Sequence, residues 1–171
     1  RENVIMKVCF VQKQLYPYIG IMSISSFLKK EGFETDVLIE AAEKNLVEKL
    51  VSLAPDVVGF SVLSSEHAWL SKMAQLVKKA LPGSVTVAGG IHATLYPIDV
   101  LNLKGIDFVC RGEGENVFPE LMKRFRNGEY SASGIVGIWY KKDEKFIDQG
   151  VAPLVDIELL REDREIYYRR Y

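Results

Sequence analysis

The strongest constraint on the fold of this chain is a repeated change in the spacing of apolar residues. Short runs of consecutive apolar residues, typical of strands buried on both faces, alternate with segments whose apolar residues recur every three to four positions, as in amphipathic helices. The predicted strands span residues 5–11, 34–40, 56–63, 84–90 and 106–112, and the predicted helices span 20–33, 45–55, 64–83 and 115–128, with a short helical turn at 97–105. Alternating strands and helices predict a parallel sheet covered by helices on both faces.

We therefore expect an α/β fold with a doubly wound, parallel, five-stranded sheet of the flavodoxin-like or Rossmann-like type, in the order 2-1-3-4-5. Local signals agree with the helix ends: Gly32 is placed to end the first helix, Asn45 to cap the second and Ser64 to cap the third. Pro119 lies within the first turns of the last helix, where proline is tolerated.

The pattern changes after residue 130. Residues 134–150 predict a C-terminal β-hairpin around the polar turn KKDEK, and residues 151–171 are charged and rich in tyrosine, with little periodicity. We interpret this last segment as a linker or tail that would need a neighbouring domain to pack against. The predicted division is a Rossmann-like domain over 1–130, followed by the hairpin and linker over 131–171.

Charge and composition exclude several classes of protein. The net charge is −1, so we expect no nucleic-acid partner, and no apolar run is long enough to span a bilayer. The N-terminal residues lack a signal-peptide pattern. Cys9 and Cys110 lie far apart inside apolar runs, which indicates buried free thiols in a reducing compartment, and hence a cytoplasmic location. The first residue is arginine, which suggests a fragment of a longer chain.

A ligand should bind where the parallel strands end, because open parallel sheets bind their ligands at that edge. Gly89 and Gly90 end the fourth strand without side chains, so a flat ligand or a nucleotide-like tail could approach the backbone there. The alternative is a crowded junction that needs glycine for steric reasons. Ser61 ends the third strand, and its hydroxyl either faces the same crevice or bonds to nearby backbone.

The remaining polar residues point to a binding module, because no catalytic set accompanies them. His92 alone is more typical of a hydrogen-bonding partner than of a metal ligand, and His67 is expected to be structural or exposed. The GEGE segment at 112–115 resembles a phosphate-binding glycine loop, but two glutamates would repel an anion, so helix capping and ligand contact both stay open. We find no nucleophile–base pair, no paired catalytic carboxylates and no metal-ligand spacing.

Several motifs together resemble those of the N-terminal B12-binding domain of cobalamin-dependent radical SAM proteins. They are SVL at 61–63, PDVVGFS at 55–61, GGIHAT at 89–94, IDFVCRGEGE at 106–115, and Pro17 to Gly20 at the entry to the first helix. The resemblance covers about residues 5–128. The segment after 134 is similar to the connector that leads into the radical SAM barrel in such proteins.

The resemblance implies cobalamin as the cofactor, with its nucleotide tail beside the sheet and its corrin ring across the edge. Gly89 and Gly90 would leave room for the tail, Ser61 would hydrogen-bond its dimethylbenzimidazole, and the loop with Tyr16 and Tyr18 would lie beneath the corrin. The cofactor-binding residues that it implies are Gln14, Tyr16, Pro17, Gly20, Ser61, Leu63, Ser64, Gly89, Gly90, His92, Thr94, Gly112 and Glu113.

Two departures limit what the resemblance implies. Methyl-transferring B12 proteins carry a D-x-H-x-x-G motif whose histidine ligates cobalt, but with Gly20 as the last glycine, Leu15 and Pro17 occupy the aspartate and histidine positions. Cobalamin is therefore expected in a base-off form without a protein histidine ligand. The C-x-x-x-C-x-x-C motif for an iron–sulfur cluster is also missing. S-adenosylmethionine and a [4Fe-4S] cluster are thus expected only in a C-terminal radical SAM domain absent from this chain.

The function that follows is that of a cobalamin-binding domain of a radical SAM enzyme, of methyltransferase or cyclase type, which orients the corrinoid for chemistry in the missing domain. One alternative is a flavodoxin-like nucleotide or flavin module, which needs a phosphate cradle that QKQLYPYIG at 12–20 does not supply. Another is a regulatory or interaction domain without ligand, which a crevice filled by loop 12–18 or tail 151–171 would favour.

Overall fold

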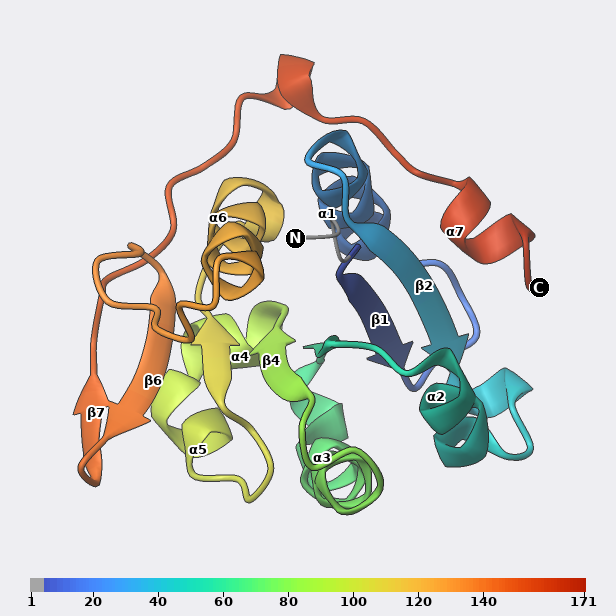
Figure 1. The fold of residues 1–171 in the computed structure, drawn as a ribbon, viewed down its shortest axis with the longest axis horizontal. Coiled ribbons are helices and arrows are strands. Elements are labelled where there is room, and N and C mark those ends of the chain that lie inside the picture. Colours follow the sequence, from blue (N-terminus) through green and yellow to red (C-terminus); the bar gives the residue numbers. More distant parts are fainter. Residues whose placement is uncertain (1–4) are drawn as a thin grey trace.

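The computed structural model of the protein describes residues 5–171, so the first four residues of the predicted 1–130 domain lie outside it. A seven-stranded sheet in the order β2-β1-β3-β4-β5-β6-β7 forms its centre (Figure 1). The strands are β1 (Lys7–Gln12), β2 (Glu34–Ile39), β3 (Val57–Ser61), β4 (Val85–Gly89), β5 (Phe108–Cys110), β6 (Ile138–Lys142) and β7 (Lys145–Ile147). The first five are parallel, which confirms the predicted order 2-1-3-4-5.

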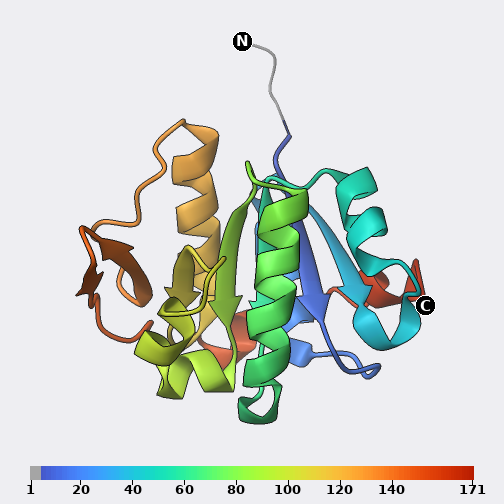
Figure 2. The same ribbon diagram turned by 90° about the horizontal axis from the view of Figure 1, so that it is seen from below.

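Helices cover both faces of the sheet (Figures 1 and 2). One face carries α1 (Ile19–Lys30) and α6 (Gly114–Arg126), and the other carries α2 (Leu46–Leu53), α3 (His67–Ala80), α4 (Ile91–Leu95) and α5 (Pro97–Leu101). Each face has its own apolar core, which explains why the parallel strands are apolar on both sides. Within residues 5–171, no helix is long and apolar enough to cross a membrane.

Local sequence signals mark the ends of two helices, but only Gly32 acts as predicted. Gly32 ends α1 with a φ of +80°, and Asn45 precedes α2, although its amide donates to Glu48 and does not cap the backbone. The predicted serine cap at Ser64 is wrong. Ser64 begins a short 3₁₀ turn, and the carboxylate of Glu66 accepts the backbone N–H of Leu63 at 3.0 Å in its place.

The predicted hairpin is confirmed, and it extends the main sheet. Asp143 and Glu144 form its turn with φ values of 49° and 61°, the left-handed conformation that two-residue hairpin turns need. Strand β6 pairs antiparallel with β5, so the parallel sheet becomes a mixed one. The division at residue 130 falls between α6 and β6 and stays a prediction.

The end of the C-terminal tail packs on its own chain, whereas Leu154 and Ile157 in its middle are 87% and 81% exposed, so the expected neighbouring domain stays a prediction. From β7 the tail passes over the side of α6 and α1 and ends with α7 (Glu165–Tyr168) beside β2 (Figure 1). Ile166 and Tyr167 are buried in the core on that face. Arg170 pairs with Asp36 at 2.8 Å, which fixes the end of the tail to β2.

A buried amide joins the tail to the loop that follows β1. Gln12 is fully buried, and its Nε2 donates to the carbonyl oxygens of Gln14 and Tyr16 at 2.6 and 2.8 Å. The hydroxyl of Tyr167 donates to Gln12 Oε1 and accepts the backbone N–H of Tyr18 at 3.0 Å. Loop 13–18 is therefore held by hydrogen bonds from Gln12 of β1 and to Tyr167 of the tail.

Tyr167→Phe tests this attachment. The change leaves Gln12 Oε1 and the Tyr18 N–H without their partner, so we expect the free energy of unfolding to fall by about 1–3 kcal/mol. Urea denaturation measures the change, and Tyr168→Phe is the matched control because Tyr168 is 69% exposed. Equal stability of the two variants would contradict the role given to Tyr167.

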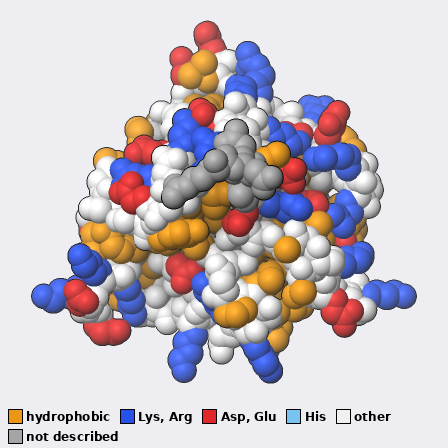
Figure 3. Space-filling model, viewed as in Figure 1, with side chains coloured by type: hydrophobic (Ala, Val, Ile, Leu, Met, Phe, Trp, Pro, Cys, Tyr) orange, Lys and Arg blue, Asp and Glu red, His pale blue; other side chains and the backbone are white. Residues whose placement is uncertain are grey.

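The edge where the parallel strands begin carries no single-sign charge on its visible surface. Figure 3 shows Lys and Arg interspersed with Asp and Glu there, around small apolar groups. A nucleic-acid site needs clustered basic side chains. The visible part of this face shows both signs of charge and no such cluster.

Candidate functional site: a cavity between α1 and α6

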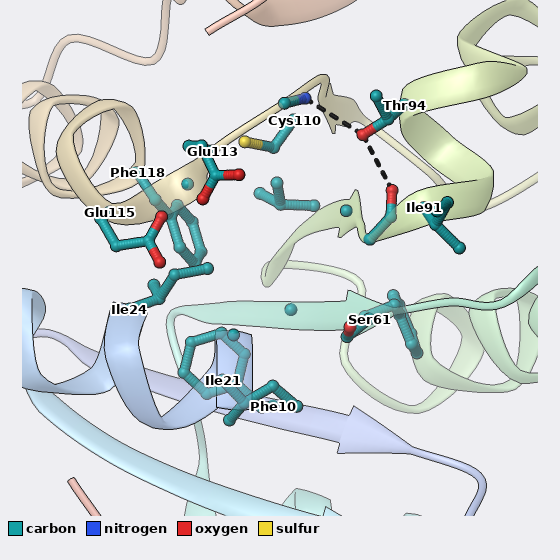
Figure 4. A pocket seen from close by; sticks show the side chains of 18 residues that line it. Phe10, Ile21, Ile24, Ser61, Ile91, Thr94, Cys110, Glu113, Glu115 and Phe118 are labelled. Atoms are coloured by element: carbon teal, nitrogen blue, oxygen red, sulfur yellow. Dashed lines mark hydrogen bonds between the residues drawn. The ribbon is translucent and has the colours of Figure 1, made fainter. Parts of the chain in front are cut away.

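A cavity of about 380 Å³ lies between the sheet, α1 and α6, and it reaches the edge where the parallel strands end (Figure 4). We call it the α1–α6 cavity. Residues of four neighbouring strands, β1, β3, β4 and β5, line it, and those of β4 alternate because every second side chain of a strand faces the same side. The lining residues are Phe10, Gly20, Ile21, Ile24, Gly59, Phe60, Ser61, Val87, Gly89, Gly90, Ile91, Thr94, Cys110, Gly112, Glu113, Gly114, Glu115 and Phe118.

Gly89 leaves open space beside the sheet, and no steric contact within the protein requires a glycine at this position. A Cβ atom built there would lie 3.7 Å from Cys110 Cβ, an ordinary van der Waals contact. Gly89 follows Val87 on the same face of β4, so a side chain at 89 would enter the cavity. The prediction that this glycine clears room at the edge of the sheet fits the geometry.

Gly90 is a glycine for a different reason. Its φ is +89°, and a Cβ atom would lie 2.8 Å from the backbone nitrogen of Val62. The backbone itself therefore requires glycine at 90, as the crowded-junction alternative supposes. The two neighbouring positions are thus glycine for different physical reasons.

Thr94 joins two of the loops at the mouth of the cavity. Its hydroxyl donates to the carbonyl oxygen of Gly90 at 3.0 Å and accepts the backbone N–H of Gly112 at 3.1 Å (Figure 4). Thr94 lies on α4, a short helix between the predicted strand 84–90 and the predicted turn at 97–105. The turn that Gly90 allows positions this helix beside the loop after β5.

Among residues 5–171, the charged side chains that line the cavity are those of Glu113 and Glu115. Glu113 directly precedes α6 and Glu115 lies in its first turn, but no side-chain capping bond is made there. Burial, followed by the charge of Glu115, raises the pKa of Glu113. Burial also raises the pKa of the neighbouring Cys110 thiol to about 12, so this thiol stays protonated at neutral pH.

A comparison with known protein families decides what kind of domain carries this cavity. The model of the B12 binding domain matches residues 7–122, which include the whole parallel sheet and both helices that flank the cavity. The chain belongs to the B12-binding domain family.

Relatives of this B12-binding domain are larger enzymes. The anaerobic magnesium-protoporphyrin IX monomethyl ester cyclase of Rubrivivax gelatinosus is 30% identical over 123 residues, which cover 68% of this chain and 22% of the cyclase. The cytidylyl-2-hydroxyethylphosphonate methyltransferase of Streptomyces wedmorensis is 31% identical over 166 residues, 82% of this chain and 30% of that enzyme. The chain thus spans under a third of either relative.

Solved structures share the fold of this domain. The radical S-adenosylmethionine methyltransferase TsrM from Kitasatospora setae, solved with cobalamin and a [4Fe-4S] cluster bound, superposes with a TM-score of 0.76 at 18% identity. The match covers 96% of this chain and 32% of TsrM. It includes most of the hairpin and tail as well as the parallel sheet.

The structure gathers seven of the thirteen predicted cofactor-binding residues around the α1–α6 cavity. These are Gly20, Ser61, Gly89, Gly90, Thr94, Gly112 and Glu113. The other six, Gln14, Tyr16, Pro17, Leu63, Ser64 and His92, do not line it. Gln14 donates to Glu66 at 3.2 Å, and Pro17 lies beside Tyr167 of the tail.

We use the name edge platform for exposed apolar side chains on α4 and on the loops at this edge. It consists of Leu15, Tyr16, Leu63, Ile91 and Leu95, which are between 37% and 61% exposed. They follow β1, β3 and β4 in the chain, so all stand at the carboxyl ends of the parallel strands. An apolar surface of this kind beside a cavity suits a ligand larger than the cavity.

The apolar floor of the cavity was not predicted from the sequence. Phe10, Val87 and Phe118 lie there around Gly59, where a Cβ atom would come within 2.8 Å of the Phe10 ring. Phe10 and Phe118 also pack edge to face at 6.1 Å between ring centroids. A glycine inside the strand VVGFS was a usable signal, because it marks a close approach in a strand.

His92 lies outside the cavity and pairs with the other histidine. Its Nε2 is 2.8 Å from Nδ1 of His67, and its own Nδ1 is buried without a hydrogen-bond partner. No group of three His, Cys, Asp or Glu able to hold a metal occurs within residues 5–171. His92 is thus a hydrogen-bonding partner that holds α4 against α3, as its isolated position in the sequence suggests.

The histidine pair predicts a loss of stability in mild acid. Burial, and then the neighbouring His67, lower the pKa of His92 below its ordinary value of 6.5. The unfolded chain therefore binds more protons than the folded chain below about pH 6.5, and stability falls as the pH falls through that value. We expect His92→Gln to flatten the decrease in urea midpoint between pH 7.5 and 5.5. An unchanged decrease would contradict this assignment.

Proposed function

We propose that this B12-binding domain holds cobalamin with the nucleotide tail in the α1–α6 cavity and the corrin ring across the edge platform. The single observation that carries the proposal is the cavity beside Gly89, at the edge where ligands bind in parallel sheets. Its volume of about 380 Å³ lies at the lower end of the range of small-molecule pockets. It therefore suits a nucleoside-sized group, and a larger ring must lie outside.

The lining residues fit that assignment chemically. Phe10, Val87 and Phe118 offer an apolar floor to a flat aromatic base. The hydroxyl of Ser61 makes no hydrogen bond with other side chains or backbone within residues 5–171, so it is available to a ring nitrogen of dimethylbenzimidazole. This differs from the alternative in which Ser61 serves the local backbone.

We propose a base-off cofactor without a histidine on cobalt. Among residues 5–171 the cavity and the edge platform contain no imidazole, and the two histidines bond to each other. When bound, the corrinoid supplies the methyl-carrying or radical-related cobalt chemistry. The residues of this chain bind it, orient it and keep its tail away from the metal.

The proposed partner is a radical SAM domain in the same longer protein, which would contain the S-adenosylmethionine and [4Fe-4S] sites. The sizes of the relatives support this, since the chain matches 22% of the cyclase and 30% of the methyltransferase. The parent reaction would then be of methyltransferase or cyclase type. We place the protein in the cytoplasm, because buried free thiols such as Cys9 persist in reducing compartments.

A spectroscopic titration tests the proposal. Hydroxocobalamin added to the protein should change its visible spectrum in a saturable way, and Ser61→Ala should weaken the binding about tenfold, the effect of one lost hydrogen bond of about 1.4 kcal/mol. Ser52→Ala is the control, because Ser52 is exposed on α2, on the opposite face of the sheet. An unchanged spectrum with the wild-type protein contradicts the proposal.

The same titration separates the alternatives. Neither loop 12–18 nor tail 151–171 supplies a residue to the lining of the cavity, so the filled crevice expected of a ligand-free domain is not seen within residues 5–171. A flavin nucleotide would bring a phosphate to a cavity whose charged residues are both glutamates. We therefore expect no binding of flavin mononucleotide, and its binding would support the flavodoxin-like alternative.

A further inference from the structure

We propose that the carboxylates of Glu113 and Glu115 form an acceptor pair that receives the ribose hydroxyls of the nucleotide tail. This inference rests on the proposed cobalamin site and names the part of the ligand that the polar wall of the cavity recognises. The two residues bracket Gly114 at the start of α6.

The helix itself leaves both carboxylates unused. An acidic residue at the start of a helix commonly accepts a backbone N–H of the first turn. Glu113 occupies that position and Glu115 lies two residues on, yet neither makes a capping hydrogen bond. Figure 4 shows both side chains at the wall of the cavity, between Cys110, Phe118 and Ile24.

Glu115 is the more deeply buried of the two carboxylates. It is only 4% exposed, and within residues 5–171 its one hydrogen-bond partner is the carboxyl of Glu113, so that bond lies inside the pair. Two neighbouring carboxylates with no other donor are costly to bury, because they repel each other when both are charged. A ligand that brings hydroxyl donors into the cavity would supply the missing partners.

The charges around the cavity decide which part of a nucleotide can lie here. Its lining, drawn from residues 5–171, includes no lysine, arginine or histidine. A phosphate beside Glu113 and Glu115 would meet two like charges and no cation. A ribose is neutral and carries vicinal hydroxyls, so it matches two adjacent acceptors, and the phosphate then lies toward the edge platform.

Close packing fixes the backbone from which the pair projects. A Cβ atom on Gly114 would lie 2.6 Å from Cδ1 of Ile24, so the start of α6 lies directly against α1. This contact sets the position of Glu113 and Glu115 relative to the cavity before any ligand arrives. A preorganised acceptor pair loses little entropy when it binds.

The test compares two fragments of the tail on the same protein. Free 5,6-dimethylbenzimidazole and its riboside, α-ribazole, are titrated by calorimetry against wild type, Glu113→Gln and Glu115→Gln. We expect the wild type to bind the riboside at least about tenfold more tightly than the base, and each variant to reduce this ratio about tenfold or to near unity. Glu120→Gln, on the exposed side of α6, should leave the ratio unchanged.

The outcomes separate this inference from the proposed function. If hydroxocobalamin binds but the riboside-to-base ratio is the same in wild type and both glutamine variants, the acceptor pair is overturned and the cobalamin site stands. If hydroxocobalamin does not bind the wild type, both fail. Urea denaturation shows whether each variant folds, and Glu113→Gln carries the test alone if the more buried Glu115 does not tolerate substitution.

Discussion

Gly89→Leu is expected to weaken hydroxocobalamin binding more than about a hundredfold, a loss of about 2.7 kcal/mol, while the protein stays folded. The reason is that Gly89 has an ordinary backbone conformation, and the nearest atom to an added Cβ is 3.7 Å away. The backbone therefore accepts a side chain, but that side chain must occupy the cavity. The proposed nucleotide tail would lose the space that it needs.

The matched control for this variant is Gly83→Leu. Gly83 is exposed at the opposite end of β4, and nothing lies within 4 Å of an added Cβ. Visible titration measures binding, and urea denaturation measures stability. If Gly89→Leu is folded and binds hydroxocobalamin as tightly as Gly83→Leu does, the α1–α6 cavity is not the site of the tail.

Gly90→Ala is expected to act on stability, although it is the adjacent residue. The combination of φ +89° and ψ −175° at Gly90 belongs to a region that only glycine readily adopts. An added Cβ would also lie 2.8 Å from the nitrogen and 3.0 Å from the oxygen of Val62, which are backbone atoms that cannot move aside. Strain of this kind costs about 1–3 kcal/mol before the clash is counted.

Comparison with Gly128→Ala separates the cost of backbone strain at a positive φ from the cost of the steric clash. Gly128 has a φ of +80°, but no atom lies within 4 Å of an added Cβ. We expect Gly90→Ala to lower the free energy of unfolding by at least about 2 kcal/mol, and by more than Gly128→Ala does. A Gly90→Ala protein with wild-type stability in urea denaturation would contradict the backbone role of this glycine.

The strand order was predictable because it depends on local periodicity and on the rules of parallel connections. The end of α1 at Gly32 was predictable for the same reason, since glycine is favoured just beyond a helix. The short helix α4 was not, because its five residues are too few for a helical pattern and depend on the turn at Gly90. The serine cap at Ser64 failed because the carboxylate of Glu66 competes for the same turn.

The candidate site was predictable only along its edge. Ser61, Gly89 and Gly112 stand where strands end, so their meeting follows from topology. The apolar floor depends on how α1 and α6 pack on the sheet, which no local pattern reports. The contact between Gln12 and Tyr167 joins residues 155 positions apart, so only the folded chain reveals it.

The structure bears on an alternative that the sequence leaves open for Glu113 and Glu115. Two interpretations fitted the GEGE segment at 112–115: its glutamates either cap the helix or contact a ligand. The absence of any capping bond at the start of α6, together with the position of both carboxylates on the cavity wall, favours ligand contact. The sequence alone could not distinguish them, because both interpretations require an acidic residue at a helix N-terminus.

The central claim is that the cavity keeps the nucleotide tail away from cobalt, and electron paramagnetic resonance of bound cob(II)alamin tests it most directly. An axial nitrogen on cobalt splits each cobalt line, whether the nitrogen comes from dimethylbenzimidazole or from a histidine. We predict that cob(II)alamin on the wild-type domain shows cobalt lines without nitrogen splitting. A spectrum that retains the nitrogen splitting would contradict the base-off form without a histidine ligand.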